Sequence, residues 1–499
     1  MGSPVIVLAT EGLTPSSVGN AERRAGQPAL RPFLDGGSQG IFSAGLARSQ
    51  AAAWATVHTG VEPSAHGVWG GRSVDGGPER AGPSIWRLAF PSLLAVAGEA
   101  GLRVAAVGVP LTWPPAAING VALTMPPDPW DSFPRGLWEA MPPSDRATLA
   151  SVETTEGVRR AEGVIRMVRW MRDQQDSDLI AIGFRHLAGA RRARGSRART
   201  GATPGMPDGL DALLRLLISE IPARALLLVS PTHAATVRSH LHLNAWLEQQ
   251  GLLRLSPSGT ARRALRRLSR RDSSACRFLM EQCALPGELG QRRGVDGKRT
   301  AALADDAGVF LSCGGRSGAP VGSDASRAPL TDRAARARFI RDSIADLPAV
   351  GNVLIRENLS AGPGLIPLPD LVVEPADEGI ATCPSLDASS VMGPAPEGEF
   401  HMIGGGVLAL AGDCAGDGDA VPMRLTDIAP TVLHILGVPV PGHMEGTVAT
   451  ELFDDSWLRD HPVRVVASPD GLPRSAAQEL SAVERQGVEA HLRALGYLG

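Results

Sequence analysis

Four side chains that can donate electron pairs to a metal ion lie close to the ends of expected strands: Glu11, His186, His233 and His401. Zinc accepts carboxylate oxygen and imidazole nitrogen, and a catalytic zinc usually has three protein ligands. One zinc or manganese ion held by this set would activate water or the hydroxyl of Ser49. The competing interpretation is that the histidines are hydrogen-bonded loop residues, because imidazole is commonly half-exposed.

Two arginine-rich runs are candidates for binding phosphates. They are RRARGSRAR (191–199) and the expected helix ARRALRRLSRR (261–271). Neither run has interleaved aromatic residues, and the chain has a single tyrosine. Solvated surfaces are therefore favoured over a nucleic-acid interface, which stays open as an alternative for either run.

The elements that must position these residues follow an alternating order. Short apolar runs predict buried strands at 4–9, 104–109, 179–182, 225–229, 353–355, 371–373 and 407–410, and helical patterns lie between them at 157–172, 209–221 and 332–344. This order predicts an α/β fold with a largely parallel central sheet between helices, and chemistry at the carboxyl ends of its strands. The predicted organisation is an α/β core (1–247 and 295–455), a basic helical cap or insertion (248–294) and a helical C-terminal tail (456–499).

Composition limits the classes of protein that the chain can belong to. It has 499 residues, 43% of them hydrophobic, and a formal net charge of −3, so it can bury a large core and has no global attraction to polyanions. We expect neither a signal peptide nor a membrane span. Five scattered cysteines without CxxC spacing predict free thiols and a cytoplasmic protein.

Several motifs stand in the order expected for one enzyme family. They are Glu11-Gly12 after the first strand, AWATVHTGVEPSAHG (53–67), residues 242–253, 296–300, 310–316 and 369–375, His401, and DIAPT (427–431). Together they resemble the type I phosphodiesterase/nucleotide pyrophosphatase branch of the alkaline phosphatase superfamily, over about residues 4–450.

The resemblance implies two zinc ions and a Thr or Ser nucleophile that attacks a phosphoryl group. The family's first-strand aspartate falls on Glu11, which is one methylene longer. Its nucleophile falls on Gln50, whose amide is no phosphoryl acceptor. Ser49 is adjacent, but one step along a helix turns a side chain by about 100°.

The remaining ligand positions of the family are also substituted. Its Asp-x-x-x-His falls on Ala188 and Arg192, and its Ser-Asp-His-Gly reads Ser230-Pro231-Thr232-His233. Only His401 matches a family ligand. One matching ligand and a lengthened carboxylate are too few for two ions, so we expect the dinuclear site to be lost and no cofactor to be needed.

The resemblance thus predicts a divergent homologue that binds a small anionic molecule of phosphate- or sulfate-ester type. It would be non-catalytic or would carry out metal-independent transfer or hydrolysis. Arg192, standing where the family has an imidazole, would bind the anion's oxygens. Trp54 and His66 are further candidates for the substrate site, although core packing is favoured for Trp54 and turn formation for His66. A hydrolase with a rebuilt one-metal site remains the main alternative.

Overall fold

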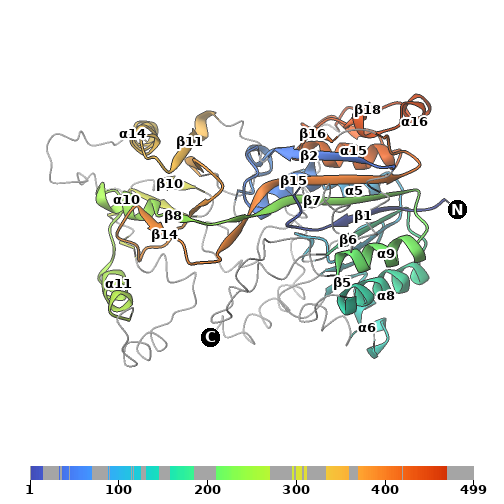
Figure 1. Cartoon of the computed structure of the whole chain (residues 1–499), viewed down its shortest axis with the longest axis horizontal. Coiled ribbons are helices and arrows are strands. Elements are labelled where there is room, and N and C mark those ends of the chain that lie inside the picture. The colour runs from blue at the N-terminus through green and yellow to red at the C-terminus, as the bar shows by residue number, and fades with distance from the viewer. Residues whose placement is uncertain are drawn as a thin grey trace.

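The computed structural model describes residues 2–14, 33, 36–43, 45–69, 88, 90–113, 115, 117–124, 131–144, 146, 158–184, 209–269, 295–296, 299–305, 308–311, 333–358, 369–417 and 420–468. Within these residues the chain forms a large layered α/β part and a smaller lobe, seen at the right and left of Figure 1. In the described residues, no helix has the length and apolar character needed to cross a membrane.

A nine-stranded sheet forms the centre of the larger part. Its strands, in spatial order, are β16 (Val421–Arg424), β2 (Ser38–Ser43), β15 (Phe400–Gly412), β7 (Ala225–Thr236), β1 (Val5–Ala9), β6 (Leu179–Gly183), β3 (Val104–Val107), β4 (Gly120–Thr124) and β5 (Asp131–Phe133). The sheet is mostly parallel, but β15 runs antiparallel to both β2 and β7, and β5 runs antiparallel to β4.

Helices cover both faces of this sheet (Figure 1). One face packs against α3 (Gln50–Thr59), α5 (Leu93–Glu99) and α15 (Ile428–Ile435), and the other against α8 (Val158–Gln174) and α9 (Leu210–Glu220). The apolar sequence of β1, VIVLA, fits this position because odd residues such as Val5 face one core and even residues such as Leu8 face the other. The predicted fold class is confirmed.

The smaller lobe has its own hydrophobic core, made by residues between 241 and 386. One sheet of the lobe consists, in spatial order, of β11 (Val350–Ile355), β12 (Leu371–Pro375), β10 (Val309–Leu311) and β9 (Ala302–Ala304). A second sheet consists of β13 (Ile380–Thr382), β8 (Ser239–Leu241) and β14 (Met392–Pro394). The helices of the lobe are α10 (Leu243–Gln249), α11 (Pro257–Ser269) and α14 (Arg333–Ala345). Of the predicted insertion 248–294, the structure describes residues 248–269.

One expectation about the sheet was wrong. The predicted strands at 353–355 and 371–373 exist as β11 and β12, but they pair antiparallel in the lobe and do not join the parallel sheet. The reason is their environment: β11 is only partly buried, whereas strands of the central sheet such as β6 are buried along their whole length. A short apolar run does not distinguish these two situations.

The remaining elements are short. They are α4 (Pro63–His66), α6 (Leu137–Ala140), α16 (Asp455–Asp460), β17 (Val440–Pro441), β18 (Val465–Val466) and the 3-10 helices Arg356–Asn358, Leu425–Asp427 and Thr450–Leu452. Of the predicted C-terminal tail, residues up to 468 are described and include most of α16 together with β18.

Candidate functional site

Four segments far apart in the sequence meet near the carboxyl ends of β1 and β7. Gly12 forms a bridge with His233 of β7, His233 pairs with Ile403 of β15, and Ile403 forms a bridge with Ser49. This chain of pairings gathers the regions of Glu11, the start of α3, His233 and His401, as the parallel-sheet prediction required. We call this region the strand-end site.

The glycines of β15 make this meeting sterically feasible. Gly404 donates its N–H to the carbonyl of Arg48, at 2.9 Å between nitrogen and oxygen. An added Cβ at Gly404 would lie 2.0 Å from the carbonyl oxygen of Ala47, and one at Gly406 would lie 2.1 Å from that of Ser230. The sequence analysis missed these residues, although three consecutive glycines in an apolar strand are a signal of close backbone approach.

Glu11 and Trp54 form a buried pair. The indole Nε1 of Trp54 donates a hydrogen bond of 2.9 Å to Glu11 Oε1, and both residues are at most 4% exposed. The ring of Trp54 therefore packs in the core beside the sheet and is not open to a substrate. The bond also satisfies one oxygen of the carboxylate that was a predicted metal ligand.

Ser49 and Gln50 stand at the beginning of α3. Ser49 is the N-cap: its Oγ accepts a hydrogen bond from the N–H of Ala52 and donates one of 2.6 Å to the carbonyl of Trp69. A hydroxyl held in this way stabilises the helix start. Gln50, the predicted nucleophile position, is the first helical residue and is half-buried.

His66 and His58 lie in the interior. His66 accepts the N–H of Val68 at Nδ1, so its Nε2 carries the proton and donates to Thr56 Oγ1, 3.0 Å away. Burial lowers the pKa of His66 to about 3 and that of His58 to about 4. Both rings are at most 3% exposed, so in the structure His66 fixes a turn and does not face a substrate.

His233 and His401 lie on the same face of the β7–β15 pair, two positions apart in register. Both contact Glu378, which belongs to the smaller lobe. His233 Nε2 lies 3.2 Å from Glu378 Oε2 and its Nδ1 lies 3.0 Å from the carbonyl oxygen of Gly405, while His401 Nε2 lies 2.8 Å from the carbonyl oxygen of Glu378. These rings link the sheet to the lobe.

Most of the described donor atoms of the predicted ligand set are engaged by protein groups. Both nitrogens of His233, Nε2 of His401 and Oε1 of Glu11 already bond to protein groups. Across the described ranges, no three His, Cys, Asp or Glu side chains form a group able to hold a metal. His186, Ala188 and Arg192 lie outside the described residues, so their predicted roles stay predictions.

Comparisons with known proteins agree with the architecture. No family model and no curated protein matches the sequence. Solved structures do match nearly the whole chain. Phosphonoacetate hydrolase from Sinorhizobium meliloti, in complex with phosphonoformate, has 14% identity and a TM-score of 0.52, covering 86% of this chain and 94% of its own.

Two further solved structures match the chain at similarly low identity and with similarly high coverage. Wild-type alkaline phosphatase PafA has 12% identity and a TM-score of 0.52, covering 91% of this chain and 99% of its own. An inactive variant of murine ectonucleotide pyrophosphatase/phosphodiesterase 5, in complex with AMP, has 12% identity and a TM-score of 0.50, covering 91% of this chain and 100% of its own.

The chain has an alkaline-phosphatase-like fold. At these identities the likeness concerns the fold, and the activity must be argued from the site itself. In this alkaline-phosphatase-like fold, the strand-end site lies where open α/β sheets generally bind their ligands.

Proposed function

We propose that the chain binds a small anionic molecule of phosphate- or sulfate-ester type at the strand-end site, without a dinuclear zinc site and without a Thr or Ser nucleophile. The observation that carries the proposal is the state of Ser49. Its hydroxyl caps α3 and bonds to Trp69, while the matching nucleophile position holds the amide of Gln50. Neither group is arranged to attack phosphorus.

Affinity for an anion is supported by the start of α3. The N–H groups of Gln50 and Ala51 precede the first intrahelical hydrogen bond, which runs from Ala53 to Ser49. The first turn of α3 contains no acidic residue. The positive end of a helix dipole and amides of this kind favour phosphate and sulfate oxygens. Arg192 is proposed to supply a guanidinium to the same ligand.

The test combines binding and turnover. We expect p-nitrophenyl phosphate to bind in the presence of a chelator, measured by titration calorimetry. We expect no hydrolysis of p-nitrophenyl phosphate, bis-p-nitrophenyl phosphate or p-nitrophenyl sulfate, with or without zinc. Arg192→Ala should weaken binding about tenfold or more, as expected for a charge-assisted hydrogen bond, whereas Arg199→Ala in the same run serves as the matched control.

The variant Gln50→Thr separates this proposal from an enzyme that lacks only its nucleophile. We expect Gln50→Thr to remain inactive with zinc, because the other ligand positions differ as well. Turnover restored by this change would contradict the proposal.

A mononuclear hydrolase is the second candidate, favoured by one observation: His233 and His401 lie on one face of neighbouring strands. It requires them to exchange Glu378 for a metal, with Glu11 and His186 completing the ligands. Elemental analysis of protein purified without chelator decides between the two candidates. One zinc or manganese ion per chain together with metal-dependent turnover would establish the hydrolase.

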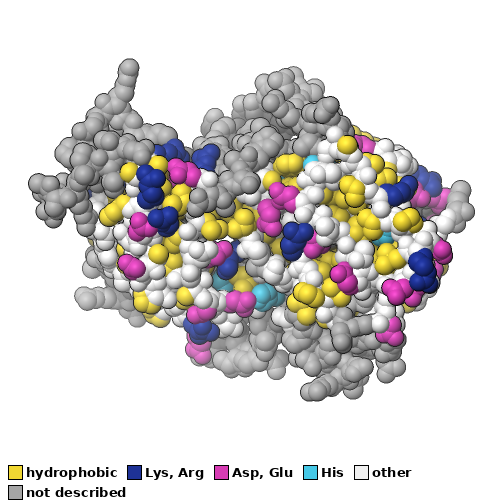
Figure 2. Space-filling view, turned by 90° about the horizontal axis from the view of Figure 1, so that it is seen from above, with side chains coloured by type: hydrophobic (Ala, Val, Ile, Leu, Met, Phe, Trp, Pro, Cys, Tyr) yellow, Lys and Arg dark blue, Asp and Glu magenta, His cyan; other side chains and the backbone are white. Residues whose placement is uncertain are grey.

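Nucleic-acid binding by the arginine runs has less support. Arg263 of α11 bonds to Glu248 and to the carbonyl of Leu386, so it serves the interior of the lobe. On the face shown in Figure 2, the described Lys and Arg side chains are interspersed with acidic ones. Salt-sensitive binding to heparin that is lost on Arg-to-Ala changes in 261–271 would revive this alternative.

A further inference from the structure

A pocket lies at the other end of the large sheet from the strand-end site. It has a volume of about 370 Å³ and is lined where β7 begins, at Arg224 and Ala225, and where β15 ends, at Asp413 and Cys414. His233 lies eight positions along β7 from Ala225, or roughly 26 Å at the rise of a strand. The pocket is therefore distinct from the strand-end site.

Stacked aromatic rings form one wall of this pocket. Phe453 stacks on Trp457 with ring centroids 5.1 Å apart, and Trp457 stacks on His461 at 4.3 Å with an angle of 14° between the rings. Trp457 and His461 line the pocket, and His461 is exposed. The ring of His461 thus ends the stack at a surface that another planar group can continue.

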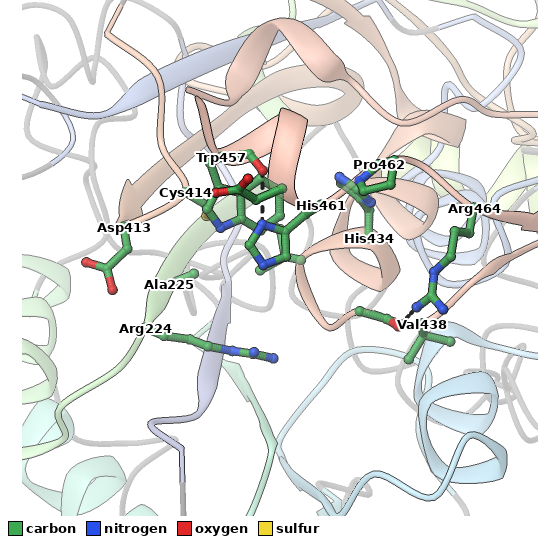
Figure 3. Close-up of a pocket in the computed structure, with 13 residues that line it drawn as sticks. Arg224, Ala225, Asp413, Cys414, His434, Val438, Trp457, His461, Pro462 and Arg464 are labelled. Carbon is green, nitrogen blue, oxygen red and sulfur yellow. Dashed lines mark hydrogen bonds between the residues drawn. The ribbon is translucent and has the colours of Figure 1, made fainter. Parts of the chain in front are cut away.

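The lining contains equal numbers of arginines and aspartates. Two arginines, Arg224 and Arg464, face two aspartates, Asp413 and Asp460. Arg464 donates a hydrogen bond to the carbonyl of Gly437. Within the part of the chain that the structure describes, neither the Arg224 guanidinium nor the Asp413 carboxylate has a hydrogen bond or an ion pair. In Figure 3 these two groups point in different directions, so they do not neutralise each other by contact.

His434 adds no charge to the pocket near neutral pH. Burial lowers the pKa of this ring, and the neighbouring His461 and Arg464 lower it further. Edge-to-face contacts with Phe453 and Trp457 hold the neutral ring in the wall. A ligand with one positive and one negative group therefore meets a lining of matching, balanced charge.

We propose that this pocket binds a small aromatic zwitterion, a molecule with a planar ring, a carboxylate and an ammonium group, such as an aromatic amino acid. The ring stacks on His461. The ligand's carboxylate is matched by the arginines of the lining, Arg224 and Arg464, and its ammonium group by the aspartates, Asp413 and Asp460.

The test uses phenylalanine and three analogues that each lack one group: alanine lacks the ring, 3-phenylpropionate the ammonium group and phenethylamine the carboxylate. Affinities for the whole chain are measured by ligand-observed NMR. We expect phenylalanine to bind at least tenfold more tightly than each analogue. Equal binding of any analogue, or no binding of phenylalanine at millimolar concentration, would overturn the proposal.

Variants locate the binding. Arg224→Ala and Asp413→Asn should each weaken phenylalanine binding at least tenfold, with urea unfolding confirming that both variants fold. Arg459→Ala is the matched control, because Arg459 is exposed on α16 but does not line the pocket. Unchanged affinity in Arg224→Ala would refute this placement. Gln50→Thr should leave phenylalanine binding intact, which makes the result independent of the function proposed for the strand-end site.

Discussion

At the scale of single residues, the buried histidines give the protein a pH-dependent stability. The pKa of His66 is lowered to about 3 and that of His58 to about 4, against about 6.5 in an unfolded chain. Below pH 6.5 the unfolded chain therefore binds protons that the folded chain does not. The free energy of unfolding should fall as pH decreases from 6.5 toward 4, by up to about 1.4 kcal/mol per pH unit for each histidine.

Urea unfolding between pH 7 and pH 5 measures this dependence. In His66→Gln the slope should decrease by the contribution of one histidine. The exposed His461 provides a control, and His461→Gln should keep the wild-type slope. An identical slope in wild type and His66→Gln would show that His66 is not the residue responsible.

The sequence revealed individual positions better than their contacts. The motif order placed Ser49 and Gln50 at a helix start, and α3 begins there. The cap was within reach of sequence reasoning, because a serine before an alanine-rich helix is a common N-cap. The bond from Trp54 to Glu11 was not, because it joins residues 43 positions apart whose rotamers depend on the packed core.

At the scale of elements, β15 holds the start of α3 through its glycines. Gly404→Ala should destabilise the protein by about 1–3 kcal/mol, because the new Cβ would meet the backbone of Ala47 and the backbone cannot swing aside as a side chain can. Urea unfolding measures the loss. The control Gly36→Ala adds a methyl group in open space and should change stability by less than about 0.5 kcal/mol. Equal stability of Gly404→Ala and wild type would contradict the close contact.

Most of the large elements could be predicted from apolar runs and helical periodicity, including β1, β6 and α9. The partners of β11 and β12 could not. Strand pairing depends on which faces are covered, and periodicity does not reveal that α14 packs on β11 in the core of the lobe.

At the scale of the whole molecule, the two cores predict separate cooperative units. Ile340 of α14 is fully buried in the core of the lobe, and Ile340→Ala should cost about 2–5 kcal/mol there. Hydrogen exchange should accelerate in β9, β10, β11 and β12 while β1 and β6 stay protected. Leu214→Ala in α9, equally buried against the large sheet, should show the reverse pattern. Equal acceleration in both regions would indicate a single unit.

The pair β7–β15 continues beyond the large sheet toward the lobe (Figure 1). Its ladder extends through the bonds from Val237 to Glu399 and from Ala395 to Arg238, directly into β8 and β14. A double-stranded connection of this kind resists torsion far better than a single-chain linker would. Rotation of the lobe would twist the β7–β15 pair at His233 and His401. A torque applied at either end of the molecule would therefore be transmitted to the strand-end site.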